Sequence, residues 1–130
     1  MAVVVGYLAT MEGRAALDAA VREAELRKDR VVVVVSTRQD EPAEQRHDLD
    51  VALAAVRDEL TAAGLDHEIR VLDGGDVADD LIGSAEETQA QLVVIGLRRR
   101  SPVGKLILGA NAQRVLFDAP CPVLTVKPDL

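Results

Sequence analysis

The sequence is poor in aromatic residues, which make up 2% of its 130 residues, with one Tyr, one Phe and no Trp. Proteins that bind single-stranded nucleic acid stack the bases on aromatic side chains, so this composition argues against that function. The formal net charge of -7 also opposes association with DNA or anionic lipid, because such binding depends on neutralising phosphates. We therefore expect neither nucleic acid nor membrane as a partner.

Cysteine and long apolar runs are also scarce. Cys121 is the single cysteine, so no internal disulfide can form, which is typical of a reducing compartment. The longest apolar runs span about five residues, whereas a membrane-spanning helix needs about twenty. The chain reaches Val3-Val4-Val5 without a basic leader, which argues against a secretory signal. These features predict a soluble, cytoplasmic protein.

The sequence does contain a regular alternation of short apolar runs and amphipathic segments. The runs are rich in Val and Ile without polar alternation, which is typical of strands buried on both faces; they lie at 2–5, 31–35, 69–72, 92–95 and 122–126. Helical periodicity separates them, over 12–28, 43–63, 76–90 and 110–118. This alternation predicts one α/β domain over residues 1–130, with an open, mostly parallel sheet and helices on both faces.

Three local signals refine this prediction. Charged Glu68 and Arg70 interrupt the third strand, so we expect it near an edge of the sheet. Asp76 is the expected N-cap of the third helix, and Gly64 is the expected stop after the second.

The segment after the fourth strand is the most informative about function. In open parallel sheets, ligands bind beyond the carboxyl ends of the strands, where the winding reverses. The segment begins at such an end with Gly96, and it reaches a predicted helix start at Ala110-Asn111, whose backbone N–H groups can bind an anion. It also contains the cations Arg98, Arg99, Arg100 and Lys105. Two interpretations stay open: a phosphate-binding loop, or a solvated basic loop that balances nearby carboxylates.

Two well-known phosphate-binding patterns are absent. A Walker A loop fails because Arg99 stands in place of its first glycine and Leu106 in place of its magnesium-binding hydroxyl. The first strand–helix turn, Gly6 to Thr10, lacks the Gly-x-Gly-x-x-Gly of dinucleotide-binding proteins. The sequence also offers no metal-ligand spacing and no nucleophile–base pair in the candidate loops, so we expect no metal ion and no catalytic residue.

Four stretches together resemble the universal stress protein family along the whole chain: the Gly6-Tyr7 turn, "VVIG", "SPVGKLILG" and "QRVLFDAPCPVLTV". The resemblance implies five parallel strands in the order 3-2-1-4-5. It also implies a homodimer formed by antiparallel pairing of the last strands, through Pro122, Val123, Leu124, Thr125 and Val126. An apolar edge strand bracketed by prolines is itself open to pairing with another chain.

In part of the family, the resemblance further implies ATP bound between the ends of strands one and four. The ATP-binding members carry Gly-x-x-Gly, nine residues, then Gly and Ser or Thr. Gly96 and Gly109 match this pattern, whereas Arg99 replaces the second glycine and Ala110 the hydroxyl. Leu8 stands where those members carry an acidic residue that contacts the nucleotide. Because Arg99 can bind phosphate through its guanidinium, we expect the phosphate half of the site to be better preserved than the nucleoside half.

The predicted nucleotide- and phosphate-binding residues are Tyr7, Leu8, Thr10, Val35, Gly96, Arg98, Arg99, Lys105, Gly109, Ala110 and Asn111. We expect a phosphate-bearing ligand, with ATP or AMP as candidates, and no required cofactor. The alternative is a ligand-free dimeric interaction protein of the same fold. A slow ATPase is the least favoured hypothesis.

Overall fold

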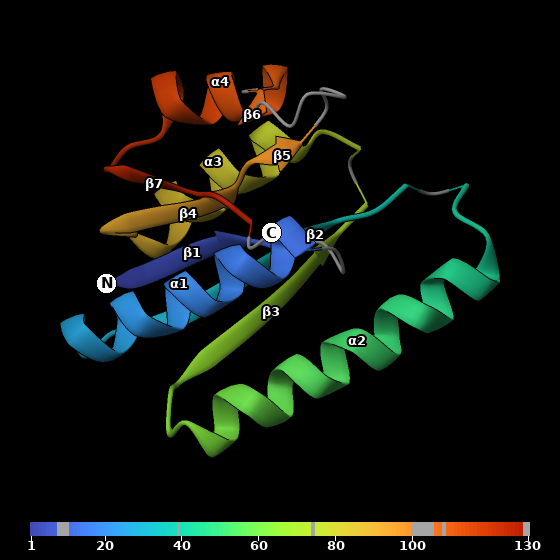
Figure 1. The fold of residues 1–130 in the computed structure, drawn as a ribbon, viewed down its shortest axis with the longest axis horizontal. Helices are drawn as coiled ribbons and strands as arrows, with labels where there is room; N and C mark the ends of the chain where they lie inside the picture. The colour runs from blue at the N-terminus through green and yellow to red at the C-terminus, as the bar shows by residue number, and fades with distance from the viewer. Residues whose placement is uncertain (8–10, 39, 74, 100–105, 108, 129–130) are drawn as a thin grey trace.

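The computed structural model describes residues 1–7, 11–38, 40–73, 75–99, 106–107 and 109–128 (Figure 1). Within them the strands are β1 (Ala2–Gly6), β2 (Arg30–Ser36), β3 (His67–Leu72), β4 (Leu92–Gly96), β5 (Arg98–Arg99), β6 (Leu106–Ile107) and β7 (Val123–Val126). The helices in the same residues are α1 (Met11–Arg27), α2 (Ala43–Ala62), α3 (Val77–Thr88) and α4 (Ala110–Asp118). None of these helices combines the length and the apolar character needed to cross a lipid bilayer.

The main sheet is parallel, and in the described residues it contains five strands in the order β3-β2-β1-β4-β7. The central strand β1 pairs on both sides, with Val3 opposite Val31 of β2 and Leu92 of β4. The chain therefore winds outward from β1 through β2 to β3, then returns past β1 to β4 and β7. This confirms the predicted strand order, with β7 as its fifth strand, and it places the reversal of winding between β1 and β4.

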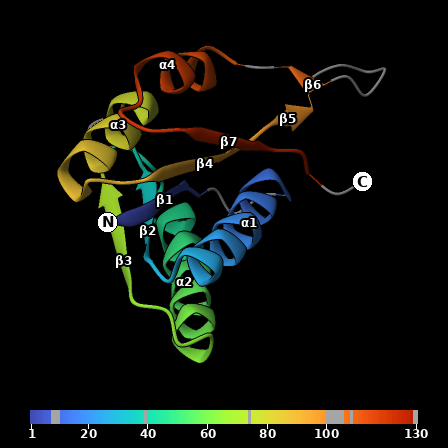
Figure 2. The same cartoon turned by 90° about the vertical axis from the view of Figure 1, so that its left-hand side faces the viewer.

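Helices cover the sheet on both faces: α1 and α2 on one, α3 and α4 on the other (Figures 1 and 2). Successive side chains of a strand point to opposite faces. Val3 and Val5 accordingly pack in the core under α1 and α2, while Ala2 and Val4 pack under α3 and α4, all fully buried. Burial on both faces explains why the central strands show no polar alternation.

The two edge strands differ from the centre. Every residue of β3 is half-buried, and its Arg70 binds Glu87 of α3 at 2.7 Å and Glu68 at 3.2 Å. The prediction that this strand lies at an edge is confirmed. At the opposite edge, β7 exposes Leu124, of which 37% is accessible.

The predicted helix ends are also confirmed. Asp76 caps α3, accepting a hydrogen bond from the Asp79 backbone N–H at 2.9 Å. Gly64 follows α2 with a φ of 71°, a left-handed conformation that glycine adopts without steric cost.

One feature was not predicted from the sequence. Arg98 and Arg99 pair antiparallel with Ile107 and Leu106, forming the small β5–β6 ribbon beside the main sheet (Figure 2). Two-residue strands are too short to show a hydrophobic period, so the sequence pattern gave no signal for them. The segment predicted to be a basic loop therefore contains paired backbone.

The end of β4 packs tightly against the start of α1. A Cβ added at Gly96 would overlap the backbone carbonyl oxygen of Glu12 and lie 2.8 Å from its carbonyl carbon. Glycine at this position allows the closest approach of helix and strand.

We predict that Gly96→Ala lowers the free energy of unfolding by about 1–3 kcal/mol, because α1 or β4 must shift to accept the methyl group. Gly83→Ala in α3 is the matched control, since its new Cβ meets no atom within 4 Å. That control should raise stability by about 0.5–1 kcal/mol through helix propensity. Urea unfolding measures the stability of both variants. A Gly96→Ala variant with the free energy of unfolding of wild type would contradict the close packing.

Candidate functional site

A cavity of about 340 Å³ lies at the carboxyl ends of β1 and β4, where the winding reverses. Its walls come from the starts of α1 and α3 and from α4, together with the end of β2. This is the position at which open parallel sheets bind ligands. The volume falls within the range of small-molecule sites.

Two glycines line the cavity at the ends of the central strands. β1 ends at Gly6 and β4 at Gly96, and both glycines line it. A Cβ at Gly6 would come within 3.2 Å of the Leu81 side chain. Glycine at both strand ends therefore allows α3 and α1 to pack closely beside the cavity.

The start of α4 forms the wall beside Gly96. Gly109 is the N-cap, and it provides no side-chain hydrogen bond to the helix. Ala110 and Asn111 follow it, and all three residues line the cavity. The first N–H groups of a helix lack intrahelical acceptors and carry partial positive charge. Since no cap side chain covers them here, this wall is chemically suited to an anion.

An ion-pair cluster ties α4 to the start of α3. Arg114 donates to Asp76 at 3.2 Å and also to Asp79. The Asp79 backbone N–H and the nearby Arg114 hold the pKa of Asp76 below its usual range. Asp79 in turn raises the pKa of Arg114. The charge of Arg114 is therefore engaged by two carboxylates that hold the walls together.

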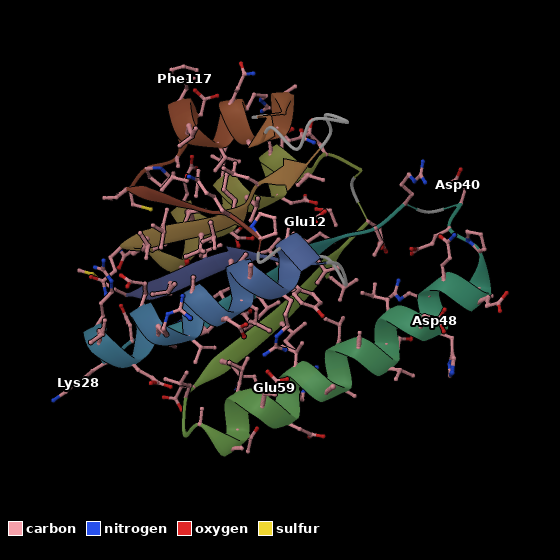
Figure 3. All side chains as sticks on the ribbon, in the orientation of Figure 1. Glu12, Lys28, Asp40, Asp48, Glu59 and Phe117 are labelled. Atoms are coloured by element: carbon pink, nitrogen blue, oxygen red, sulfur yellow. The ribbon has the colours of Figure 1, made fainter. Side chains whose placement is uncertain are left out.

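Tyr7 and Glu12 occupy the α1 side of the cavity. Tyr7 is 7% exposed, and burial raises the pKa of its phenol. Its backbone N–H donates to the Val34 carbonyl at 3.0 Å, which continues the strand pairing one residue beyond β1. Glu12 lies at the beginning of α1 (Figure 3).

The end of the cavity near β2 contains a serine hydroxyl that is hydrogen-bonded to a carboxylate. Ser36, the last residue of β2, donates to Asp80 of α3 at 2.6 Å and lines the cavity beside Val77. Ser36 was not among the site residues predicted from the sequence. The available signal was its position, as the first polar residue after a buried run at the carboxyl end of a strand.

The structure brings five of the predicted site residues together around this cavity: Tyr7, Gly96, Gly109, Ala110 and Asn111. Val35 does not line it. Its side chain is 2% exposed and packs in the core under α1 and α2, because alternation along β2 turns Val34 and Ser36 to the cavity instead.

The side chains of the other predicted site residues are not described by the structure. Leu8, Thr10 and Lys105 are not among the described residues, and for Arg98 and Arg99 the backbone alone is described. Among the described residues that line the cavity, none is Lys or Arg.

The part of the chain that the structure describes holds no group of three or more His, Cys, Asp or Glu residues placed to bind a metal ion. Cys121 is half-buried at the start of the last strand region, and burial raises the pKa of its thiol. A protonated thiol packed in this way is a weak nucleophile.

The fold and the cavity define the class of the protein: a doubly wound α/β domain whose crevice lies at the switch point of the sheet. The model of the universal stress protein family matches residues 1–127. A universal stress protein of Mycolicibacterium smegmatis is 40% identical over 126 residues, which are 97% of each chain. The chain belongs to the universal stress protein family.

Two solved structures support this assignment. A universal stress protein from Archaeoglobus fulgidus superposes with a TM-score of 0.83 at 32% identity, covering 98% of each chain. A structure of the universal stress protein from Archaeoglobus fulgidus in complex with dAMP gives a TM-score of 0.78 at 27% identity, again covering 98% of each chain.

We predict that Asp76→Asn lowers the Tm at neutral pH, because it removes the charge that Arg114 binds. A carboxyl group whose pKa is lowered in the folded state stabilises the protein above its unfolded pKa, and this contribution is lost as the pH falls through the folded value. The difference in Tm between wild type and Asp76→Asn should therefore shrink below about pH 4. Calorimetric scans across pH measure it.

Asp48→Asn is the control, since Asp48 is exposed on α2 (Figure 3). Its Tm should match wild type at each pH. A deficit of Asp76→Asn that stays constant into acid would contradict the charge argument.

Proposed function

We propose that the protein binds a phosphate-bearing ligand of the adenine nucleotide class, with AMP or ATP as candidates, in the cavity at the end of β1 and β4. The observation that carries this proposal is the start of α4, which opens into the cavity without a capping side chain. A phosphate placed there would accept hydrogen bonds from backbone N–H groups and interact favourably with the helix dipole.

The cationic residues that follow β4 support placing the phosphate at the β4 end of the cavity. Arg98 and Arg99 belong to β5, which follows directly from Gly96 and Leu97 of the cavity wall. We assign their guanidinium groups, and the ammonium of Lys105, the role of binding phosphate oxygens. Charge-assisted hydrogen bonds of this kind contribute roughly 1.5–3 kcal/mol each.

The structural relative bound to dAMP is consistent with this proposal, because it covers almost the whole chain at 27% identity. We interpret the function as binding without turnover and without a required cofactor. In the described part of the cavity, Tyr7 is a buried phenol with a raised pKa, so its nucleophilic phenolate form is disfavoured. We place this binding protein in the cytoplasm, in agreement with its single cysteine.

We predict that Ala110→Asp weakens the binding of AMP and ATP by at least about tenfold in isothermal calorimetry. Two negative charges about 5 Å apart repel by roughly 3 kcal/mol at an effective dielectric of about 20, which exceeds the 1.4 kcal/mol of a tenfold change. An acidic residue in the first turn is favourable for a helix, so the fold should persist.

Ala43→Asp is the matched control, because Ala43 is the exposed first residue of α2 and lies outside the cavity lining. It introduces the same charge at a helix start, and affinity should stay at the wild-type value. If calorimetry detects no heat with AMP or ATP at millimolar concentration, the nucleotide proposal is overturned and the ligand-free interaction protein is favoured.

We further propose that two copies pair through the open edge of β7. Among the described strands, β4 is the one that pairs with β7. The carbonyl of Pro122 accepts from Val93 of β4 at 3.0 Å, and that of Val126 accepts from Leu97, just after β4, at 2.8 Å. By the alternation of a strand, the backbone groups of Val123 and Thr125 then point to the open side, where they can pair with another strand.

We predict that Thr125→Pro yields a monomer in sedimentation velocity, because proline removes an outward N–H while leaving the bonds to β4. Thr125→Val keeps the N–H and a similar shape, so it should sediment as a dimer. A Thr125→Pro variant that remains dimeric would contradict pairing through this edge.

A further inference from the structure

Ser36 and Asp80 form a polar pair at the end of the cavity that lies away from α4. Ser36 lines the cavity, and its hydroxyl donates to the Asp80 carboxylate at 2.6 Å. Asp80 lies in the first turn of α3, and its own backbone N–H donates to the Asp76 carbonyl at 3.0 Å. Both partners therefore belong to regular secondary structure, Ser36 to β2 and Asp80 to α3.

This hydrogen bond fixes what the hydroxyl can offer to a ligand. A carboxylate accepts hydrogen bonds and donates none, whereas a hydroxyl has one proton and two lone pairs. Because the hydroxyl proton of Ser36 is donated in the hydrogen bond to Asp80, the oxygen lone pairs of Ser36 remain for the cavity. Ser36 thus acts toward a ligand as an acceptor.

The position of Ser36 relates it to the base of a nucleotide. β1 lies between β2 and β4, so Ser36 is separated from the β4 end of the cavity by two strand spacings, about 10 Å. This distance is comparable with that between the base and the phosphate of a nucleoside monophosphate. With the phosphate at the start of α4, the base extends toward Ser36, and Val77 and Leu81 line the cavity beside it.

We infer that Ser36, oriented by Asp80, selects a base with an N–H donor facing the end of β2, such as the 6-amino group of adenine. A base with a carbonyl oxygen at that position, such as hypoxanthine, would face the lone pairs of Ser36 without a shared proton. Sites built around a buried hydrogen-bonding group reject analogues that leave it unpaired. This inference rests on the proposed nucleotide binding and adds a selectivity determinant to it.

The test compares AMP with IMP by calorimetry, because hypoxanthine has a carbonyl oxygen where adenine has its 6-amino group. Hypoxanthine also carries a proton on N1, so the change caused by Ser36→Ala, rather than the wild-type ratio alone, reports the contact with Ser36. Wild type should bind AMP on the order of tenfold more tightly than IMP. Ser36→Ala should bring the two affinities to within about twofold, mainly by weakening AMP. Asp80→Asn should raise the relative affinity for IMP, because an amide can donate to Ser36 and release the hydroxyl proton toward the ligand.

Thr37→Val is the matched control. Thr37 also donates its hydroxyl to a carboxylate, that of Asp73, but it is 5% exposed and lies outside the cavity lining. Its ratio of AMP to IMP affinity should equal that of wild type. Circular dichroism establishes that each variant is folded, and Asp80→Asn carries the test if Ser36→Ala does not fold.

The outcomes separate the two proposals. If AMP binds and its preference over IMP is the same in wild type, Ser36→Ala and Asp80→Asn, the role of Ser36 is overturned while nucleotide binding stands. If neither nucleotide binds wild type, the proposed function fails, and the inference about Ser36 fails with it.

Discussion

The structure depends on the double coverage of its central strand. β1 pairs with β2 on one side and β4 on the other, and its alternating side chains are buried under helices on both faces. The burial of each Val side chain stabilises the fold by about 1.5–3 kcal/mol, and none of this apolar surface can be left uncovered. The helices that follow β1 and β2 must therefore cover one face and those that follow β3 and β4 the other. The cavity lies where these two sets of helices meet, at the carboxyl ends of β1 and β4.

The cavity consequently has two chemically different ends. Near β4, the start of α4 presents backbone N–H groups without a capping side chain. Near β2, Ser36 presents oxygen lone pairs because its hydroxyl proton is donated in the hydrogen bond to Asp80. Between them, glycine backbone and apolar side chains such as Leu81 and Val115 form the surface. The proposed adenine nucleotide fits this order at its two ends, because it has an anionic phosphate at one end and a hydrogen-bond donor, the 6-amino group, at the other.

The fold could be predicted from the sequence because its signals are local and repeated. Unbroken Val-rich runs indicate strands buried on both faces, and Asp76 and Gly64 mark helix ends that the structure confirms. The order of the strands came from the family resemblance, since periodicity does not reveal which strands are neighbours. The β5–β6 ribbon was missed because two-residue strands carry no period.

The candidate site was less predictable. Gly96, Gly109 and the start of α4 could be found because glycine and helix-start signals are visible in the sequence. Val35 does not line the cavity, because a shift of one residue along a strand turns a side chain to the opposite face. Ser36 was missed because its role depends on Asp80, 44 residues away in the chain.

The central claim is that the start of α4 binds the phosphate of a nucleotide in the cavity. A titration of the isotopically labelled protein with AMP, followed by amide NMR, tests it most directly. The account predicts saturable shifts of the backbone N–H signals of Gly96, Ala110, Asn111 and Ala112. Unchanged signals at millimolar AMP, or shifts confined to the far end of the sheet around Gly64 and Asp66, would contradict it.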